Sequence, residues 1–296
     1  MGVFYLTKLG GKMYLFKDID NNEFDQYAIT KKLKNIGAHD SDILFIHTDI
    51  AFGTPNISIK RKEYLEALYN SIKDLNVGTL IFPAFSYSFC NNEVFDVRKT
   101  KTSMGVLNEY VRKLPEAQRT IDPLLSLVLF GKQKHLLDGN LGQHSLGIDS
   151  AFDKLHHKAN GMKFLFFGAE FEEYFTYVHY VEKILDVPYR FDKAFSGKII
   201  DYNGNEYEDT HYIHTQCGKV KLKNYHQMKL ELIDEKKLKS TKLGNLELVC
   251  LSEEDAYKAI YNRISNNINS FVEPFLQEDL THEYTFGKNG ERVTHC

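Results

Sequence analysis

The chain has 296 residues, of which 43% are apolar and 26% are charged, and this composition is ordinary for a soluble globular protein. Lys and Arg number 37 against 40 Asp and Glu, so the formal net charge is only −3. No segment has the dense basic run of a nucleic-acid-binding face, so we expect no nucleic-acid partner.

The cysteines and the N-terminal segment indicate in which cellular compartment the protein is expected. The four cysteines are Cys90, Cys217, Cys250 and Cys296. They are far apart and form no CxxC pair, which argues against a disulfide framework or a zinc site. Their scatter fits a reducing cytosol, so we expect a cytoplasmic protein. Lys8 and Lys12 interrupt the apolar residues of the first sixteen positions, so this segment suits neither a signal peptide nor a membrane span.

Strand and helix patterns alternate along the chain. In order they predict a strand at 42–47, a helix at 60–75, a strand at 78–85, a helix at 103–114, a strand at 126–131, a helix at 150–159, a strand at 161–168, a helix at 171–185, shorter polar strands within 189–215, a strand at 246–251 and a helix from 252 to about 272. The basic stretch 221–242 is interpreted as a solvated helix face.

This alternation predicts an α/β protein. We expect one layered domain over residues 1–276, with a mixed central β-sheet flanked by helices. The polar segment 277–296 is expected to be an irregular C-terminal tail.

The strongest chemical signal lies in residues 166–190. Thr176, His179 and Glu182 are spaced three residues apart on a predicted helix, so neighbours share a face. A histidine beside a carboxylate suits general-base chemistry, because imidazole takes up a proton near neutral pH. The alternative is a packed histidine, hydrogen-bonded within a helix rich in Tyr and Val.

Three further segments carry weaker signals. A strand delivers His47 and Thr48 into a loop, which is where α/β proteins place ligands. Lys101, Thr102 and Ser103 precede a predicted helix, where free amides, hydroxyls and lysines favour an anion site; an ordinary helix cap fits equally well. The stretch 119–131 predicts only an ordered loop before a strand.

Six segments, taken in order, resemble the antibiotic (aminoglycoside) 3-N-acetyltransferase family. They read FIHTDIAFG, GTLIFPAF, TKTSMGVLNEYVR, RTIDPLLSLVLFG, SAFDKL and GAEFEEYFTYVHYVE, and they run collinearly from about residue 41 to 190. The resemblance implies that family's fold and the transfer of an acyl group from acyl-CoA, either acetyl-CoA or a short hydroxyacyl-CoA, to an amine.

The resemblance also implies roles for particular residues. His179 matches the catalytic histidine and Glu182 the carboxylate beside it, while Thr176 falls in the same motif. The His47–Thr48 loop and the turn from Thr102 to Gly105 match the segments that hold CoA, with Lys101 next to them. We assign Thr176 and Asp122 to the acceptor site and expect no metal.

The chain departs from the family pattern at three positions. Asp49 stands where the family usually has Ser, Asp122 replaces a histidine before Pro123, and Ala151 replaces a proline. The near balance of charges favours a neutral or anionic acceptor over a polycation. We therefore expect a nucleotide-linked amino sugar, as used in surface-glycan synthesis, with an aminoglycoside as the alternative.

Other classes of function stay open at this stage. The fold could serve a non-catalytic binding protein, although Thr176, His179 and Glu182 occur together. A metal-dependent hydrolase would need clustered ligands, and its only close histidine pairs are His156–His157 and His211/His214. We expect a small-molecule acceptor, no membrane partner and a homodimer as the possible assembly.

Overall fold

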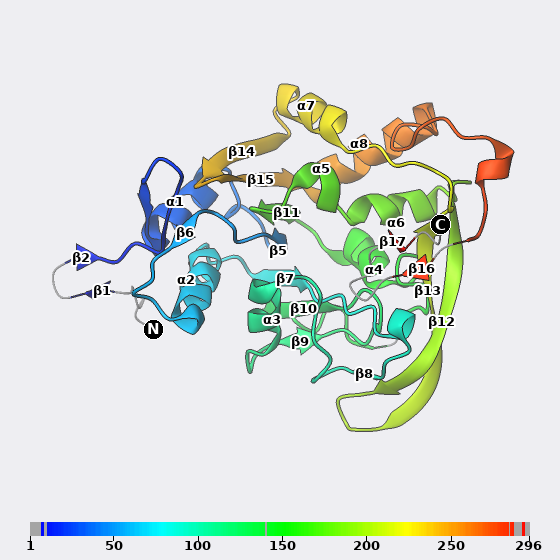
Figure 1. Cartoon of the computed structure of the whole chain (residues 1–296), viewed down its shortest axis with the longest axis horizontal. Coiled ribbons are helices and arrows are strands. Elements are labelled where there is room, and N and C mark those ends of the chain that lie inside the picture. Colours follow the sequence, from blue (N-terminus) through cyan, green and yellow to red (C-terminus); the bar gives the residue numbers. More distant parts are fainter. Residues whose placement is uncertain (1–6, 9–10, 140, 284, 287–291, 294–296) are drawn as a thin grey trace.

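The computed structural model describes residues 7–8, 11–139, 141–283, 285–286 and 292–293. Among these residues a mixed seven-stranded sheet forms the centre of the protein (Figure 1). In spatial order its strands are β14 (Leu238–Leu243), β15 (Leu246–Ser252), β11 (Met162–Phe167), β5 (Ile43–Thr48), β7 (Thr79–Pro83), β10 (Leu127–Gly131) and β9 (Gln118–Arg119). The fold is therefore α/β with a mixed sheet, as predicted.

Three neighbouring strands at the centre run parallel. Strand β5 pairs in parallel with β7 on one side and β11 on the other, whereas β10, β15, β14 and β9 join antiparallel. All residues of β5 from Ile43 to His47 are buried, which explains the apolar run from Ile43 to Ile46. Ile43 and Phe45 enter one core, and Leu44 and Ile46 enter the other.

Helices cover both faces of the sheet. On one face lie α1 (Gln26–Asn35), α2 (Arg61–Lys73) and α3 (Val106–Arg112). On the other lie α4 (Ala151–Lys158), α6 (Tyr177–Ile184) and α8 (Glu253–Asn266). The remaining helical segments are α5 (Phe171–Tyr174), α7 (His226–Asp234) and the single 3-10 turns η1 (Phe89–Asn91) and η2 (Gln277–Asp279).

Smaller sheets surround this three-layered centre. The hairpin of β12 (Arg190–Ile200) and β13 (Glu206–Gln216) pairs with β8 (Phe95–Asp96) and runs down one side of the molecule (Figure 1). The short strands are β3 (Phe16–Lys17), β4 (Glu23–Phe24) and β6 (Thr54–Pro55) in one sheet, β1 (Thr7–Lys8) with β2 (Gly11–Lys12), and β16 (Thr285–Phe286) with β17 (Arg292–Val293). The last pair and η2 lie within the predicted tail.

The predicted helix over 171–185 is broken in the structure. It forms α5 and α6, separated at Phe175, whose backbone leaves the helical region with φ −84° and ψ 78°. The buried Phe175 ring packs against Phe164 and Phe166, at centroid distances of 4.9 and 5.1 Å. This break places Thr176 directly before α6, so His179 lies in the first turn of that helix.

Four other predicted elements differ from the observed ones. Helix α3 begins at Val106 and not at 103. Helix α8 ends at Asn266 and not near 272, because the backbone of Asn267 is extended and the Ser270 hydroxyl donates to the Arg263 carbonyl. The shorter strands expected within 189–215 are two eleven-residue strands. The stretch 221–242 is divided between α7 and β14, and α7 buries Met228 and Leu232.

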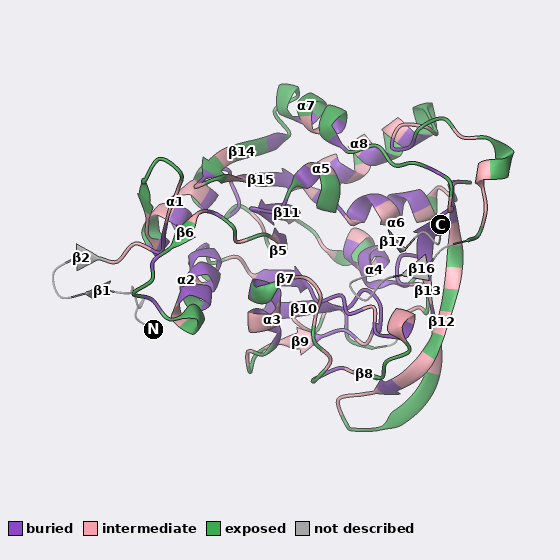
Figure 2. Cartoon of the chain, viewed as in Figure 1, coloured by how far each residue is buried: buried purple, intermediate pink, exposed green. Residues whose placement is uncertain are grey.

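Burial follows this architecture. The central strands are buried, whereas α7 and the outer part of the β12–β13 hairpin are exposed (Figure 2). Within the described residues, no helix combines the length and the apolar character that crossing a membrane requires.

Candidate active site

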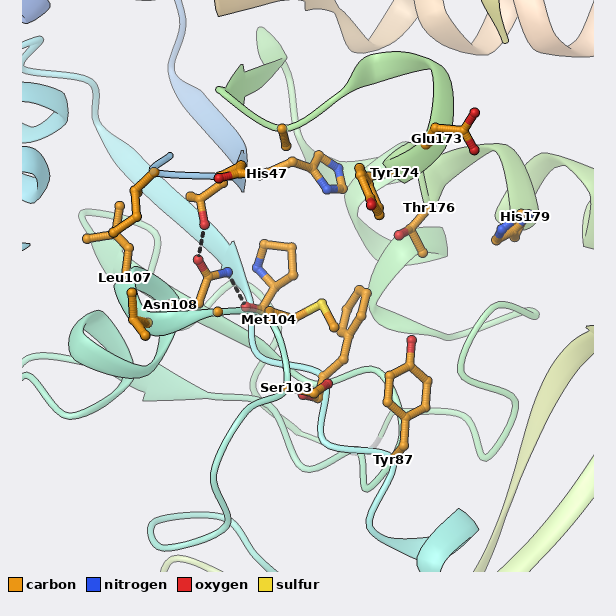
Figure 3. A pocket seen from close by; sticks show the side chains of 18 residues that line it. His47, Tyr87, Ser103, Met104, Leu107, Asn108, Glu173, Tyr174, Thr176 and His179 are labelled. Atoms are coloured by element: carbon orange, nitrogen blue, oxygen red, sulfur yellow. Dashed lines mark hydrogen bonds between the residues drawn. The ribbon is translucent and has the colours of Figure 1, made fainter. Parts of the chain in front are cut away.

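A cavity of about 500 Å³ opens at the carboxyl ends of the three parallel strands (Figure 3). His47 and Thr48 end β5, Pro83 ends β7, and Ala169 follows β11. The chain leaves β5 for β7 on one side and later returns to β11 on the other. The cavity therefore lies where the strand order reverses, which is the usual ligand-binding position in open α/β sheets.

Two other segments complete the cavity wall. The turn and first residues of α3 contribute Ser103 to Asn108, and α5 with the start of α6 contributes Glu173, Tyr174, Thr176 and His179. Figure 3 shows His47 and Thr176 on the same side of the cavity as Tyr174, with Ser103 and Tyr87 across from them. The structure thus gathers residues from four separate stretches of sequence.

Among the described residues that line the cavity, His179 is the histidine whose ring is both hydrogen-bonded to a carboxylate and partly open to solvent. Its side chain is 28% exposed, and Nδ1 lies 2.8 Å from Oε2 of Glu182, which is only 1% exposed. When Nδ1 carries the proton, it donates to this carboxylate and leaves the lone pair of Nε2 available. That tautomer is the one a general base requires.

Glu182 is held as a buried carboxylate. Burial alone would raise its pKa, but the Arg190 guanidinium and hydrogen bonds from His179 and Tyr189 outweigh burial and hold the pKa at about 2. The Arg190 Nε lies 2.6 Å from Oε2, and the Tyr189 hydroxyl donates to Oε1 at 3.0 Å. The carboxylate is therefore charged at neutral pH and fixed in orientation.

The same arginine also acts on His179. Its Nη2 lies 2.8 Å from His179 Nδ1, so Arg190 and Glu182 favour opposite tautomers of the imidazole. Burial, followed by the positive charge of Arg190, lowers the pKa of His179, although Glu182 opposes the shift. His179 is therefore mainly neutral near pH 7 and able to accept a proton.

His47 differs from His179 because no carboxylate among the described residues pairs with it. It is 6% exposed, and its ring stacks on Phe166 at a centroid distance of 4.8 Å and meets Phe175 edge-on. Burial lowers the pKa of His47 to about 3, so the ring is neutral at physiological pH. Its Nε2 has no hydrogen-bond partner among the described residues.

Thr48 and Asn108 connect the strand ends to α3. The Thr48 hydroxyl donates to the Asn108 side-chain oxygen, and the Asn108 amide donates to the Pro83 carbonyl at 2.7 Å (Figure 3). Asn108 is 2% exposed, so these bonds are shielded from water. The pair fixes the ends of β5 and β7 at the cavity floor.

The turn before α3 is arranged differently from the predicted helix cap. Thr102 and Ser103 both donate their hydroxyls to the Phe85 carbonyl, at 2.9 and 3.2 Å. The residue preceding the helix is Gly105, whose φ of +90° favours glycine. Ser103 and Gly105 line the cavity, whereas Lys101 and Thr102 are not among its lining residues.

Asp122 lies apart from the cavity lining. Its Oδ1 accepts hydrogen bonds from the backbone amides of Leu124 and Leu125 and from the Ser145 hydroxyl. The side chain is 3% exposed and holds the turn before β10. These contacts give Asp122 a structural task, and the structure does not bring it to the other predicted site residues.

Sequence reasoning missed several residues of the site. Asn108 lies inside the segment TKTSMGVLNEYVR, and Arg190 ends the stretch 166–190. Neither carries a local signal, because the partners of Asn108 are distant in sequence and those of Arg190 lie on a different element. Asp49 and Glu173 are exposed carboxylates at the cavity, and the described lining residues include no Lys or Arg. The Asp and Glu side chains among the described lining residues are therefore not balanced by a Lys or Arg in the lining.

One histidine of each pair considered as a metal ligand is hydrogen-bonded to a carboxylate. His156 bonds Glu253 at 2.8 Å, and His214 bonds Asp192 at 2.9 Å. Within the part of the chain that the structure describes, no three His, Cys, Asp or Glu side chains are grouped so that they could hold a metal ion.

The sequence matches the aminoglycoside 3-N-acetyltransferase family over residues 51–265, well over half of the chain. No curated protein sequence matches it significantly. The YokD protein from Bacillus subtilis has a similar structure, with 20% identity, a TM-score of 0.66 and coverage of 82% of this chain and 94% of that one.

Two solved acetyltransferases are also similar. The apoenzyme of aminoglycoside acetyltransferase AAC(3)-IVa has 16% identity and a TM-score of 0.66, with coverage of 89% of this chain and 94% of that one. The AAC-IIIb binary complex with CoASH has 16% identity and a TM-score of 0.67, with coverage of 85% and 98%. At these identities the structural similarities establish the fold, whereas the family match establishes membership. The chain belongs to the aminoglycoside 3-N-acetyltransferase family and is a CoA-dependent N-acyltransferase.

Proposed function

We propose that this enzyme transfers the acetyl group of acetyl-CoA to an amine of a cationic amino sugar, with His179 as the general base. One observation carries the proposal: His179 is partly exposed in a cavity at the sheet switch point while its Nδ1 is 2.8 Å from the buried Glu182 carboxylate. A donor fixed on one ring nitrogen leaves the other nitrogen free to take a proton from the acceptor.

The reaction follows from this arrangement. The amine nitrogen attacks the thioester carbonyl and forms the C–N bond, while His179 Nε2 accepts the proton that the amine releases. The tetrahedral intermediate then collapses, the C–S bond breaks, and the CoA thiolate takes up the proton from His179. Glu182 stabilises the transient imidazolium, because its carboxylate stays charged with a pKa of about 2.

The donor subsite is proposed along the strand ends and the turn before α3. His47, Thr48, Ser103 and Gly105 line this part of the cavity, and Met104 and Leu107 give it an apolar wall that suits the pantetheine arm. Lys101 and Thr102 precede the turn and stay predicted contacts for the CoA phosphates. A short hydroxyacyl-CoA is the alternative donor.

The acceptor subsite is proposed beside Thr176 and His179. Asp49 and Glu173 place carboxylates at the cavity, which favours an ammonium group over a phosphate. This local charge argues for an aminoglycoside and against the nucleotide-linked amino sugar that the net charge of the whole chain had suggested. Net charge describes the entire surface, whereas the acceptor meets only the cavity wall.

Asp122 is not assigned to this subsite, and the homodimer and the cytoplasmic location stay predictions.

The test is a thiol-release assay with acetyl-CoA, joined to mass spectrometry of the acceptor. Aminoglycosides and UDP- or dTDP-linked amino sugars are supplied separately. We expect one acetyl group on an aminoglycoside, and His179→Gln should lower kcat by about two to four powers of ten. His157→Gln is the matched control, because His157 is 65% exposed and lies outside the cavity lining.

Two results would contradict the proposal. Near wild-type turnover by His179→Gln would show that His179 is not the general base. Acetylation of the nucleotide-linked sugars alone would show that the acceptor is anionic and not cationic.

A further inference from the structure

His47 is a polar side chain without a partner at the floor of the cavity. It is 6% exposed, and no described residue bonds its Nε2, which is buried. A buried nitrogen left unpaired costs free energy comparable to a lost hydrogen bond, so such groups call for a functional explanation. The cavity beside the ring is the place from which a ligand atom can supply the missing bond.

The orientation of the ring is fixed by aromatic neighbours. It lies nearly parallel to Phe166, with an interplanar angle of 12°, and edge-on to Phe175 at 88°. Phe45, on the same strand, lies 5.2 Å away between centroids. In Figure 3 the imidazole points from the end of β5 toward Tyr174 and Thr176. The ring is therefore held in place before any substrate binds.

We propose that His47 is a catalytic residue that donates a hydrogen bond from Nε2 to the thioester oxygen as negative charge develops there. This inference rests on the proposed acetyl transfer and deepens it. A neutral ring can donate from one nitrogen without competing with His179 for the acceptor's proton. Burial keeps His47 in that neutral form, since its pKa is about 3.

The hydrogen bond already forms to the bound thioester and strengthens at one stage of the transfer. When the amine forms the C–N bond, the carbonyl π electrons move to the oxygen, and Nε2–H stabilises this oxyanion without transferring its proton. The C=O bond then re-forms as the C–S bond breaks and the thiolate leaves. His47 ends in its starting state, so the step needs no further reactant.

Access to Nε2 requires a small local movement. The nitrogen is covered in the free protein, and Tyr174 lies beside the ring in Figure 3. Tyr174 is 61% exposed and lines the same cavity, so we expect its side chain to be the one that moves aside when the donor binds.

The test compares two substitutions that separate packing from hydrogen bonding. His47→Phe keeps an aromatic ring but removes the donor, whereas His47→Gln keeps a donor but loses the ring. We expect His47→Phe to lower kcat by about 10²–10³-fold, with the affinity for CoASH unchanged, and His47→Gln to retain more activity. The reverse order, or a loss confined to CoASH affinity, would overturn the assignment.

A measurement on the unaltered enzyme covers the case in which both variants misfold. In the isotope-edited infrared spectrum of bound acetyl-CoA, the thioester carbonyl band should move to lower frequency than in water. An unshifted band overturns the proposal for His47. Failure here is distinct from failure of the proposed function, which the wild-type transfer assay and His179→Gln decide without reference to His47.

Discussion

The Nε atom of Arg190 lies 2.6 Å from Oε2 of Glu182, and the two side chains are only 5% and 1% exposed. Glu182 belongs to α6 and Arg190 begins β12, so this ion pair joins the helix that carries His179 to the long hairpin. Each charge has left water and depends on the other for compensation.

Removing the arginine should therefore be costly. Arg190→Gln leaves Glu182 as an unpaired buried carboxylate, and we expect the free energy of unfolding to fall by about 3–5 kcal/mol in urea titrations. Lys198→Gln breaks an exposed pair with Glu206 and should cause no measurable change. Equal stability of the Arg190 variant and the wild type would mean that the buried pair contributes nothing.

The acid limb of turnover should lie below the usual histidine range. Burial and Arg190 lower the pKa of His179 from its ordinary value of 6.5, so the active neutral form persists at lower pH. We expect kcat/KM to decline only as the pH falls through this depressed pKa, and to be insensitive to this group above pH 7. In Arg190→Gln the limb should move to higher pH, because a charge that disfavours imidazolium is gone. A limb at the same pH in both enzymes would assign it to another group.

Glu182 should also make the folded state sensitive to acid. Its folded pKa of about 2 is below the ordinary value of 4.5, so its contribution to stability is complete above pH 4.5 and is lost as the pH falls toward 2. Urea unfolding of the wild type should therefore weaken more steeply across this window than that of Glu182→Gln. Parallel curves would show that Glu182 is not the group responsible.

Asn108 should support both stability and donor binding. Asn108→Ala removes the acceptor of the Thr48 hydroxyl and the donor to the Pro83 carbonyl, and we expect a loss of about 1–3 kcal/mol. The KM for acetyl-CoA should rise more than kcat falls, because the cavity floor moves while His179 stays in place. Asn262→Ala, at an exposed position on α8, is the control and should match the wild type.

The sequence predicted the centre of the fold better than its edges. Strands β5, β7 and β11 are mostly apolar because both faces are covered, so their pattern is unmistakable. Strand β14, which reads LKSTKL, buries only its two leucines at the sheet edge, and its lysines resemble those of a solvated helix. The break at Phe175 involves no Gly or Pro and arises from packing, so no local signal announces it.

The site residues likewise divide into those that the sequence predicted and those that it did not. His47, Thr48, Ser103, Gly105, Thr176 and His179 all come to one cavity, and each lies in a recognisable segment. Asn108 and Arg190 could not be predicted, because Asn108 depends on strand ends far away in sequence and Arg190 depends on how the hairpin folds against α6. The acidic wall was also hidden, since 37 basic residues balance the carboxylates over the chain as a whole.

The parallel pairing of β5 with β11 also has a kinetic consequence. His47 is in register with Phe166, although well over a hundred residues separate them, and the intervening chain contains β7, β10 and α4. Contacts between such distant segments form slowly, because a long loop must close before they add stability. During refolding, catalytic competence should therefore return with the slowest phase, after most helical signal has been regained.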